Sequence, residues 1–131
     1  MERVLGIGGF FFRAKNPSEI GRWYKEHLGI DLPPSTYEEL PWQQESGPTV
    51  FAAFPETTTY FGPAKNNWMI NFRVHNLDAM MAQLRASGIE IEIDPEPYPN
   101  GRFARLTDPE GNPIQLWEPT GQDAVGGKGR P

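Results

Sequence analysis

The sequence predicts an α+β domain made of two tandem β-α-β-β-β modules, and three observations lead to this prediction. Segments of strand and helix composition follow one another in the same order in both halves of the chain. The expected helices begin at Asn16 and Asn76, 60 positions apart, and end at Gly29 and Gly88, 59 positions apart. Because helix start and helix end shift together, the chain reads as a repeat of one unit. An ordinary α+β sandwich with coincidentally matched helix ends is the alternative.

The composition indicates one soluble globular domain of 131 residues. The absence of cysteine excludes disulfides, thiolate metal sites and cysteine nucleophiles. The net charge is −5 and the basic residues are spread along the chain, whereas nucleic-acid binding requires them clustered, so we expect no nucleic-acid partner. No apolar run approaches the roughly 20 residues of a membrane span and no signal peptide is recognisable, so we expect no membrane association and a cytoplasmic location.

The first module is expected to cover residues 1–62. Residues 4–13 are rich in glycine and aromatic residues and have strand composition. Residues 18–28 are predicted to form an amphipathic helix, because their apolar residues recur every three or four positions. Two paired antiparallel strands are predicted at 42–45 and 49–54, and a short strand around Tyr60.

The second module is expected to cover residues 63–120 and repeats this order. A strand is predicted at 68–74, followed by a helix at 77–86. Three more strands are predicted at 89–93, 102–106 and 113–118. A turn is predicted at 108–112, between the last two of them. We treat residues 1–120 as a single domain and expect residues 121–131 to form a disordered tail.

Three segments carry a resemblance to a known family. They are Asn16-Pro17 through Trp23-Tyr24 to Leu28-Gly29-Ile30, Ile70-Asn71-Phe72-Arg73-Val74 followed by Asn76-Leu77-Asp78, and Gly101-Arg102-Phe103 through Asp108-Pro109-Glu110-Gly111-Asn112 to Glu118-Pro119. With them the chain resembles the vicinal oxygen chelate superfamily, which includes glyoxalases, bleomycin-resistance proteins and extradiol dioxygenases. The resemblance implies curved antiparallel sheets that form a cup around a ligand or a metal, and a homodimer, since many members are dimers, some with swapped modules.

The resemblance also implies four strand positions that hold a divalent cation in the enzymes of the family. In this sequence they fall on Gly9, Phe51, Met69 and Gln115. Glycine and phenylalanine offer no side-chain donor, a thioether suits a hard cation poorly, and Gln115 supplies one neutral oxygen. We therefore expect no metal and no other cofactor, with one divalent metal as the alternative. His27 and His75 lie on different elements and are not expected to complete a site.

Strand alternation indicates which side chains share a face with these four positions. The expected ligand-binding residues are Gly9, Phe11, Phe51, Met69, Asn71, Arg73, Gln115 and Trp117. This lining is mostly apolar, with polar groups at Asn71, Arg73 and Gln115, and it predicts a small apolar or aromatic ligand. Two alternatives stay open: the aromatic side chains fill a collapsed cup, or Arg73 is a solvated rim residue. Arg105 is a second arginine able to pair with a carboxylate or to stack on a ring.

These observations predict a metal-free, glyoxalase/bleomycin-resistance-like protein that binds a small molecule. The alternative is an enzyme of the same superfamily, a lyase, isomerase or dioxygenase, with an atypical or metal-free site. No catalytic residue is assigned by the sequence, because no nucleophile triad or phosphate-binding glycine loop is recognisable in it.

Overall fold

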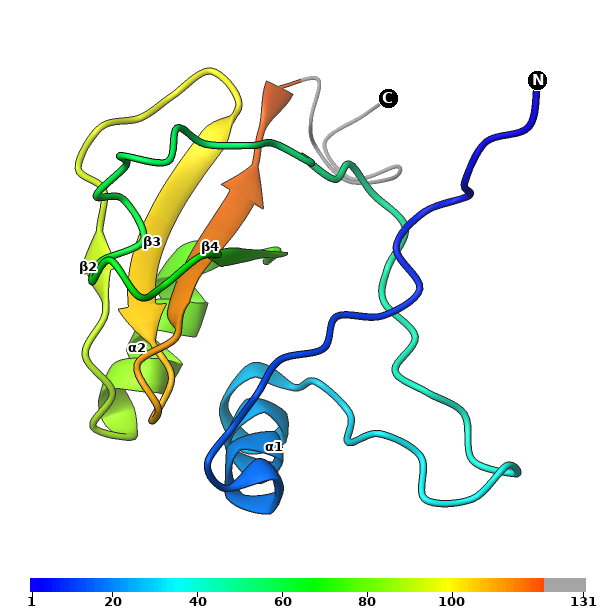
Figure 1. Cartoon of the computed structure of the whole chain (residues 1–131). Coiled ribbons are helices and arrows are strands. Elements are labelled where there is room, and N and C mark those ends of the chain that lie inside the picture. Colours follow the sequence, from blue (N-terminus) through cyan, green and yellow to red (C-terminus); the bar gives the residue numbers. More distant parts are fainter. Residues whose placement is uncertain (122–131) are drawn as a thin grey trace.

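The computed structural model describes residues 1–121. The disordered tail expected at 121–131 lies outside the described residues except for its first member. The described chain contains two helices, α1 (Pro17–Leu28) and α2 (Leu77–Ala86). Four strands form one open sheet: β1 (Ile70–Arg73), β2 (Glu92–Ile93), β3 (Gly101–Thr107) and β4 (Pro113–Pro119) (Figure 1). Of the described helices, neither is long and apolar enough to cross a membrane.

The α+β class and the β-α-β-β-β order of the second module are confirmed. The strand order is β1-β4-β3-β2, with β2, β3 and β4 antiparallel. The prediction of a wholly antiparallel sheet is wrong for one pair, because β1 runs parallel to β4. The connections explain this. α2 returns the chain so that β2 runs in the direction of β1, and two hairpin reversals then bring β4 into that direction again.

Both helices have the expected ends because their caps are local. The Asn16 side chain accepts a hydrogen bond from the Glu19 backbone N–H, and the Asn76 side chain accepts one from that of Ala79. Gly29 closes α1 with φ of 74°, a left-handed conformation that glycine adopts without a steric penalty.

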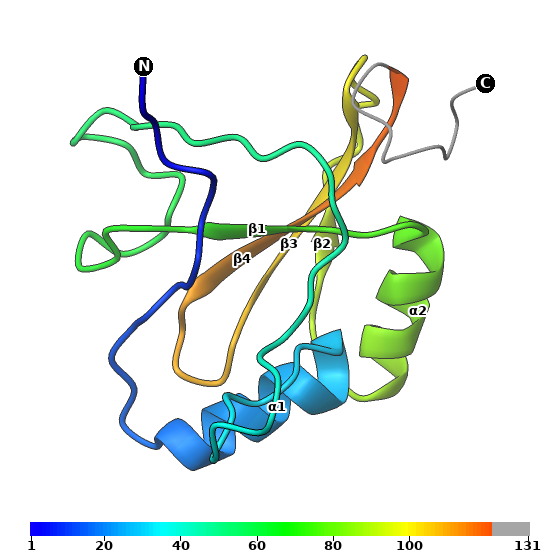
Figure 2. The ribbon, with the colours of Figure 1, turned by 90° about the vertical axis from the view of Figure 1, so that its right-hand side faces the viewer.

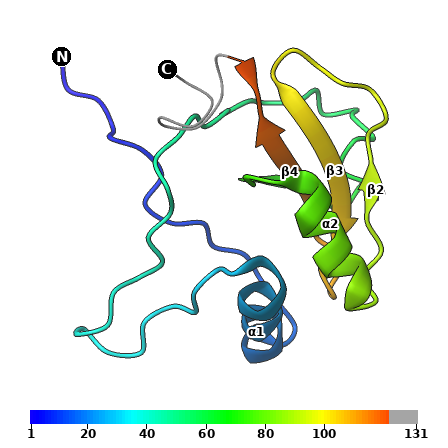
Figure 3. The ribbon, with the colours of Figure 1, turned by 180° about the vertical axis from the view of Figure 1, so that it is seen from behind.

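The core lies between the helices and one face of the sheet. Figure 3 shows α2 lying across that face, and Figure 2 shows α1 beneath it. The largest fully buried side chains of the core are Leu77, Leu84, Ile114 and Leu116. Because Ile114 and Leu116 point into this core, the side chains of Gln115 and Trp117 lie on the opposite face of β4.

The strands predicted in the first module do not form in the described residues. Residues 4–13, 42–45 and 49–54 are extended without strand pairing, and the chain around Tyr60 makes turns. Figures 1 and 3 show the N-terminal chain and the chain after α1 reaching away from the sheet. The reason is that an alternating sequence becomes a strand only where another strand supplies hydrogen-bond partners and a shared apolar face.

Candidate functional site

The sheet face turned away from α2 collects side chains from three strands. We call it the open face and define it by six residues: Asn71, Arg73, Phe103, Arg105, Gln115 and Trp117. Strand register orders them in two rows. Asn71 lies opposite Gln115, which lies opposite Arg105, and in the next row Arg73 lies opposite Trp117, which lies opposite Phe103. One row is therefore polar, and the other is mainly aromatic.

The polar row is fixed by side-chain hydrogen bonds. The Asn71 Nδ2 donates to Gln115 Oε1 at 2.7 Å. The Gln115 Nε2 in turn donates to the hydroxyl of Tyr60 at 2.9 Å. Since the Gln115 oxygen is already used by Asn71, this amide presents an N–H donor toward the space above the sheet.

Tyr60 belongs to a segment of turns, residues 55–66, that crosses the open face. In Figure 1 the chain leading into β1 passes in front of β3 and β4. The Arg105 guanidinium carbon lies 4.3 Å from the centre of the Tyr60 ring, and Arg105 also donates to the Tyr60 backbone carbonyl. The sequence did not indicate Tyr60 as a site residue. Tyr60 and Arg105 are 45 positions apart, and a contact between such distant residues produces no periodic pattern in the sequence.

The aromatic row is formed by Phe103 and Trp117. Their rings are stacked, with centres 6.0 Å apart and planes 4° apart. Trp117 is only 3% exposed, and its Nε1 donates to the Asn100 carbonyl at 2.9 Å. Phe103 therefore presents more of the row's accessible aromatic surface, while Trp117 supports it from the side. Phe103 is a second residue that the sequence analysis left off the site.

Arg73 secures another segment of the first module. Its Nη2 donates to the Glu45 carbonyl at 2.8 Å, and its guanidinium lies against Gly47, in the space where a side chain at position 47 would begin. Beside it, His75 Nε2 lies 2.9 Å from a carboxylate oxygen of Glu45. His75 thus has a carboxylate partner in the first module.

The remaining predicted site residues lie on the first module or directly before β1. Phe11 is 92% exposed and Phe51 is 93% exposed, so both contact almost nothing in the described chain. Gly9 lies beside the Phe11 ring, and Met69 is half-buried just ahead of β1. The structure brings Asn71 and Gln115 into direct contact and places Arg73 and Trp117 on the same face, but it leaves Gly9, Phe11 and Phe51 apart from it.

A cavity of about 350 Å³ opens beside Tyr60 at the β2–β3 edge. It is lined by Tyr60, Glu92, Ile93, Asp94, Pro95, Phe103 and Arg105. Its volume falls within the range of small-molecule pockets, and it combines an aromatic wall with a guanidinium and two carboxylates.

The model of the glyoxalase-like domain family matches residues 9–117. The chain belongs to this family. A 58-residue stretch of this glyoxalase-like domain is 36% identical to CFP32, a protein named after the glyoxylases, in both Mycobacterium bovis and Mycobacterium tuberculosis. That stretch is 44% of the chain but only 22% of CFP32, so the chain spans about a fifth of its relatives' length.

The fold of the glyoxalase-like domain is also found in a solved structure. The crystal structure of TnmS3, an antibiotic binding protein from Streptomyces sp. CB03234, matches with a TM-score of 0.60 and 19% identity. The match covers 92% of this chain and all of TnmS3. It shows that the two proteins share a fold.

The glyoxalase-like domain does not present a donor set that fits a divalent cation at the four positions implied by the resemblance. Gly9 and Phe51 have no side-chain donor, and Met69 offers a soft sulfur. Both polar atoms of the Gln115 amide take part in hydrogen bonds to other side chains. Within residues 1–121, His, Asp and Glu side chains form no group of three placed to hold a metal.

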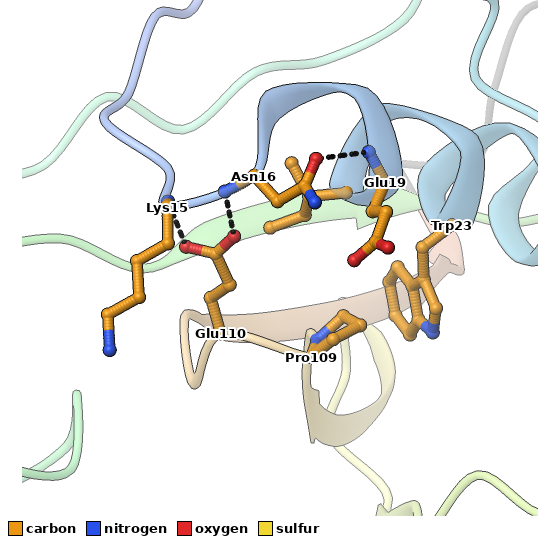
Figure 4. A pocket seen from close by; sticks show the side chains of 7 residues that line it. Lys15, Asn16, Glu19, Trp23, Pro109 and Glu110 are labelled. Carbon is orange, nitrogen blue, oxygen red and sulfur yellow. Dashed lines mark hydrogen bonds between the residues drawn. The ribbon is translucent and has the colours of Figure 1, made fainter.

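A second hollow of the glyoxalase-like domain, about 320 Å³, lies where α1 meets the β3–β4 turn (Figure 4). There the Glu110 carboxylate accepts hydrogen bonds from the backbone N–H groups of Lys15 at 2.7 Å and Asn16 at 3.0 Å. These two bonds hold the pKa of Glu110 below its ordinary value. The carboxylate therefore anchors the entry into α1, and this hollow has a structural explanation.

Proposed function

We propose that this glyoxalase-like protein binds a small apolar or aromatic molecule on the open face, without a metal or other cofactor. The observation that carries the proposal is the pairing of an aromatic row with a hydrogen-bonded polar row on one sheet face. Burial of apolar ligand surface supplies most of the affinity, at about 25 cal/mol per Å², while the polar groups select an orientation. The antibiotic binding by TnmS3, a protein of the same fold, is consistent with this role.

Within the proposal Met69 and Phe103 contribute apolar surface, Trp117 supports the Phe103 ring from the side, and Asn71, Arg73 and Gln115 orient the ligand. Arg73 can act on an anion because the partner of its guanidinium is the neutral carbonyl of Glu45, which leaves the charge uncompensated by that contact.

The proposal also includes a homodimer in which a second copy covers the first module. In the part of the chain that the structure describes, all exposed large apolar side chains except Tyr98 precede β1. Extended apolar segments with unpaired backbone groups are stabilised by pairing with another chain. In such a dimer Gly9, Phe11 and Phe51 line the ligand site from these covered segments.

The test is ligand binding by the 131-residue chain, measured by tryptophan fluorescence and calorimetry with 2-naphthoate and 2-naphthamide. These probes have the same ring system and differ in charge. Arg73→Ala is expected to weaken the binding of 2-naphthoate by about 1.5–3 kcal/mol more than the binding of 2-naphthamide, because only the anion loses a charge-assisted hydrogen bond. Arg22→Ala, an exposed change on α1, is the matched control.

Equal losses for both probes would show that Arg73 has only a structural role. If neither probe nor a wider panel of aromatic compounds bound to the wild-type protein, the binding function itself would be refuted.

A further inference from the structure

Tyr60 makes on the open face the contacts that a bound phenol would make. Its hydroxyl accepts from Gln115 Nε2 at 2.9 Å, and its ring lies under the Arg105 guanidinium at 4.3 Å. On the segment's own side, Phe54 stacks on the same ring at 6.1 Å with planes 22° apart. Tyr60 is nevertheless 37% exposed and lies outside the hydrophobic core. The ring is thus bound to the face and not packed into the protein.

In the described residues, the hydrogen bonds that join the segment carrying Tyr60 to the sheet are made by Tyr60. Within residues 55–66 the other hydrogen bonds of the described structure are local, such as Thr58 N–H to Pro55 and Gly62 N–H to Thr59. The bonds that reach the sheet are those of Tyr60 with Gln115 and Arg105. Displacing the Tyr60 side chain therefore uncovers Gln115 and the ring site beside Arg105 without breaking a strand or a helix, while the bond from Arg105 to the Tyr60 backbone carbonyl can stay in place.

The groups left behind define the ligand that they would accept. The Gln115 oxygen is turned toward Asn71 and its N–H toward the Tyr60 hydroxyl, so the group that faces the place of Tyr60 is a donor and favours an oxygen acceptor. The Arg105 guanidinium favours the face of an electron-rich ring. The cavity of about 350 Å³, of which Tyr60 is one wall, provides room for the rest of a larger molecule.

We infer that the open face is selective for hydroxylated aromatic compounds, and that Tyr60 occupies their place until such a compound displaces it. This inference rests on the proposed function, because it names the ligand class of the same face. Tyr60 acts as an intramolecular competitor, so the apparent affinity is the intrinsic affinity multiplied by the fraction of molecules in which Tyr60 has left the face.

The experiment uses the full chain and two fluorinated probes, 4-fluorophenol and fluorobenzene, observed together by ¹⁹F NMR titration. Tyr60→Ala is expected to bind 4-fluorophenol at least about fivefold more tightly than the wild type does, since the hydrogen bond and cation–π contact of the Tyr60 side chain no longer compete with the ligand. In that variant 4-fluorophenol should bind about two- to tenfold more tightly than fluorobenzene. Tyr37→Ala, at a tyrosine that is fully exposed, should behave as wild type.

Two further variants keep the test decisive if Tyr60→Ala folds poorly. Tyr60→Phe keeps the ring and removes the hydroxyl, so its affinity for 4-fluorophenol should fall between those of wild type and Tyr60→Ala. In the Tyr60→Ala background, Gln115→Leu should abolish the preference for the hydroxylated probe.

Equal 4-fluorophenol affinity in wild type and Tyr60→Ala would overturn the competitor role. Equal affinity of Tyr60→Ala for the two probes would overturn the hydroxyl selection. If 2-naphthoate binds the wild-type protein in either case, the proposed function stands while this inference fails.

Discussion

The hydroxyl of Tyr24 donates a 2.6 Å hydrogen bond to Asp108 Oδ2, which joins α1 to the β3–β4 turn across 84 positions of the chain. Asp108 is only 4% exposed. Its two oxygens also accept from the backbone N–H groups of Glu110 and Asn112 and from the Asn112 side chain. Burial and the neighbouring Asp108 carboxylate raise the pKa of the Tyr24 phenol above its ordinary value. The phenol therefore stays protonated and remains a donor.

Tyr24→Phe is expected to lower the free energy of unfolding by about 1.5–3 kcal/mol, because a buried carboxylate loses a charge-assisted donor. Urea denaturation followed by circular dichroism measures this value. The control is Tyr98→Phe, which removes a hydroxyl that bonds to Asp94 on the exposed surface. A loss no larger than in the control would contradict the role assigned to the Tyr24–Asp108 bond.

Acid stability should depend on Glu110, whose pKa is held below its ordinary value of 4.5 by the backbone N–H groups of Lys15 and Asn16. A carboxylate with a lowered pKa in the folded state stabilises the fold above its unfolded pKa, and this contribution disappears as the pH falls through the lower folded value. Glu110→Gln should therefore lower the midpoint of thermal unfolding at pH 7. When the pH is lowered below about 4.5, this midpoint should decrease less in the variant than in the wild type. Glu26→Gln, an exposed change on α1, should retain the wild-type pH profile.

Gly101 is required at the start of β3 for both its conformation and its surroundings. Its φ is 140°, and a Cβ there would overlap the Glu118 carbonyl and the Trp117 indole nitrogen. Gly101→Ala is expected to destabilise the protein by at least about 1–3 kcal/mol through backbone strain, with a further loss from displacing Trp117. Denaturant titration with tryptophan fluorescence reports both effects. Gly6→Ala, at a position with open space around it, is the control.

The sequence was sufficient for the elements whose signals are local. Capping residues such as Asn16 and Asn76 fixed the helix ends, and alternation along β4 placed Gln115 and Trp117 on the face opposite the core. The predicted alternation of side chains around Phe11 is present in the structure, because Phe10 and Phe12 pack near Trp68 while Phe11 is exposed. These residues nevertheless do not form a strand, since alternation by itself supplies no pairing partner.

The parts that depend on distant contacts could not be predicted in this way. Tyr60 meets Arg105 and Gln115 across 45 and 55 positions, and its neighbours are three threonines and a turn. The strands expected in the first module failed for a related reason. Pairing partners are a property of the assembled structure, and the described chain does not supply them to residues 4–13 or 49–54.

The proposed homodimer predicts a concentration-dependent mass in sedimentation equilibrium. Replacing Phe11 and Phe51 together by serine should weaken association, since both side chains are more than nine-tenths exposed in the single chain and would lose apolar contact only with a partner. Tyr98→Ser, at the exposed aromatic residue that lies outside the first module, should leave the mass unchanged. A wild-type protein that stays monomeric at micromolar concentration would refute the homodimer.

Removal of divalent metal should leave the protein and its binding unchanged. The four positions that the family resemblance assigns to metal ligands hold Gly9, Phe51, Met69 and Gln115, and the Gln115 amide is used by Asn71 and Tyr60. A zinc or iron site requires three or more suitable donors, so a resident ion would have no adequate ligand set there. A chelator should therefore shift neither the thermal midpoint nor the affinity for 2-naphthoate, because no bound ion is lost from the folded state. Elemental analysis that found about one metal ion per chain after dialysis, together with a chelator-induced loss of affinity, would show that other residues hold a metal at the site.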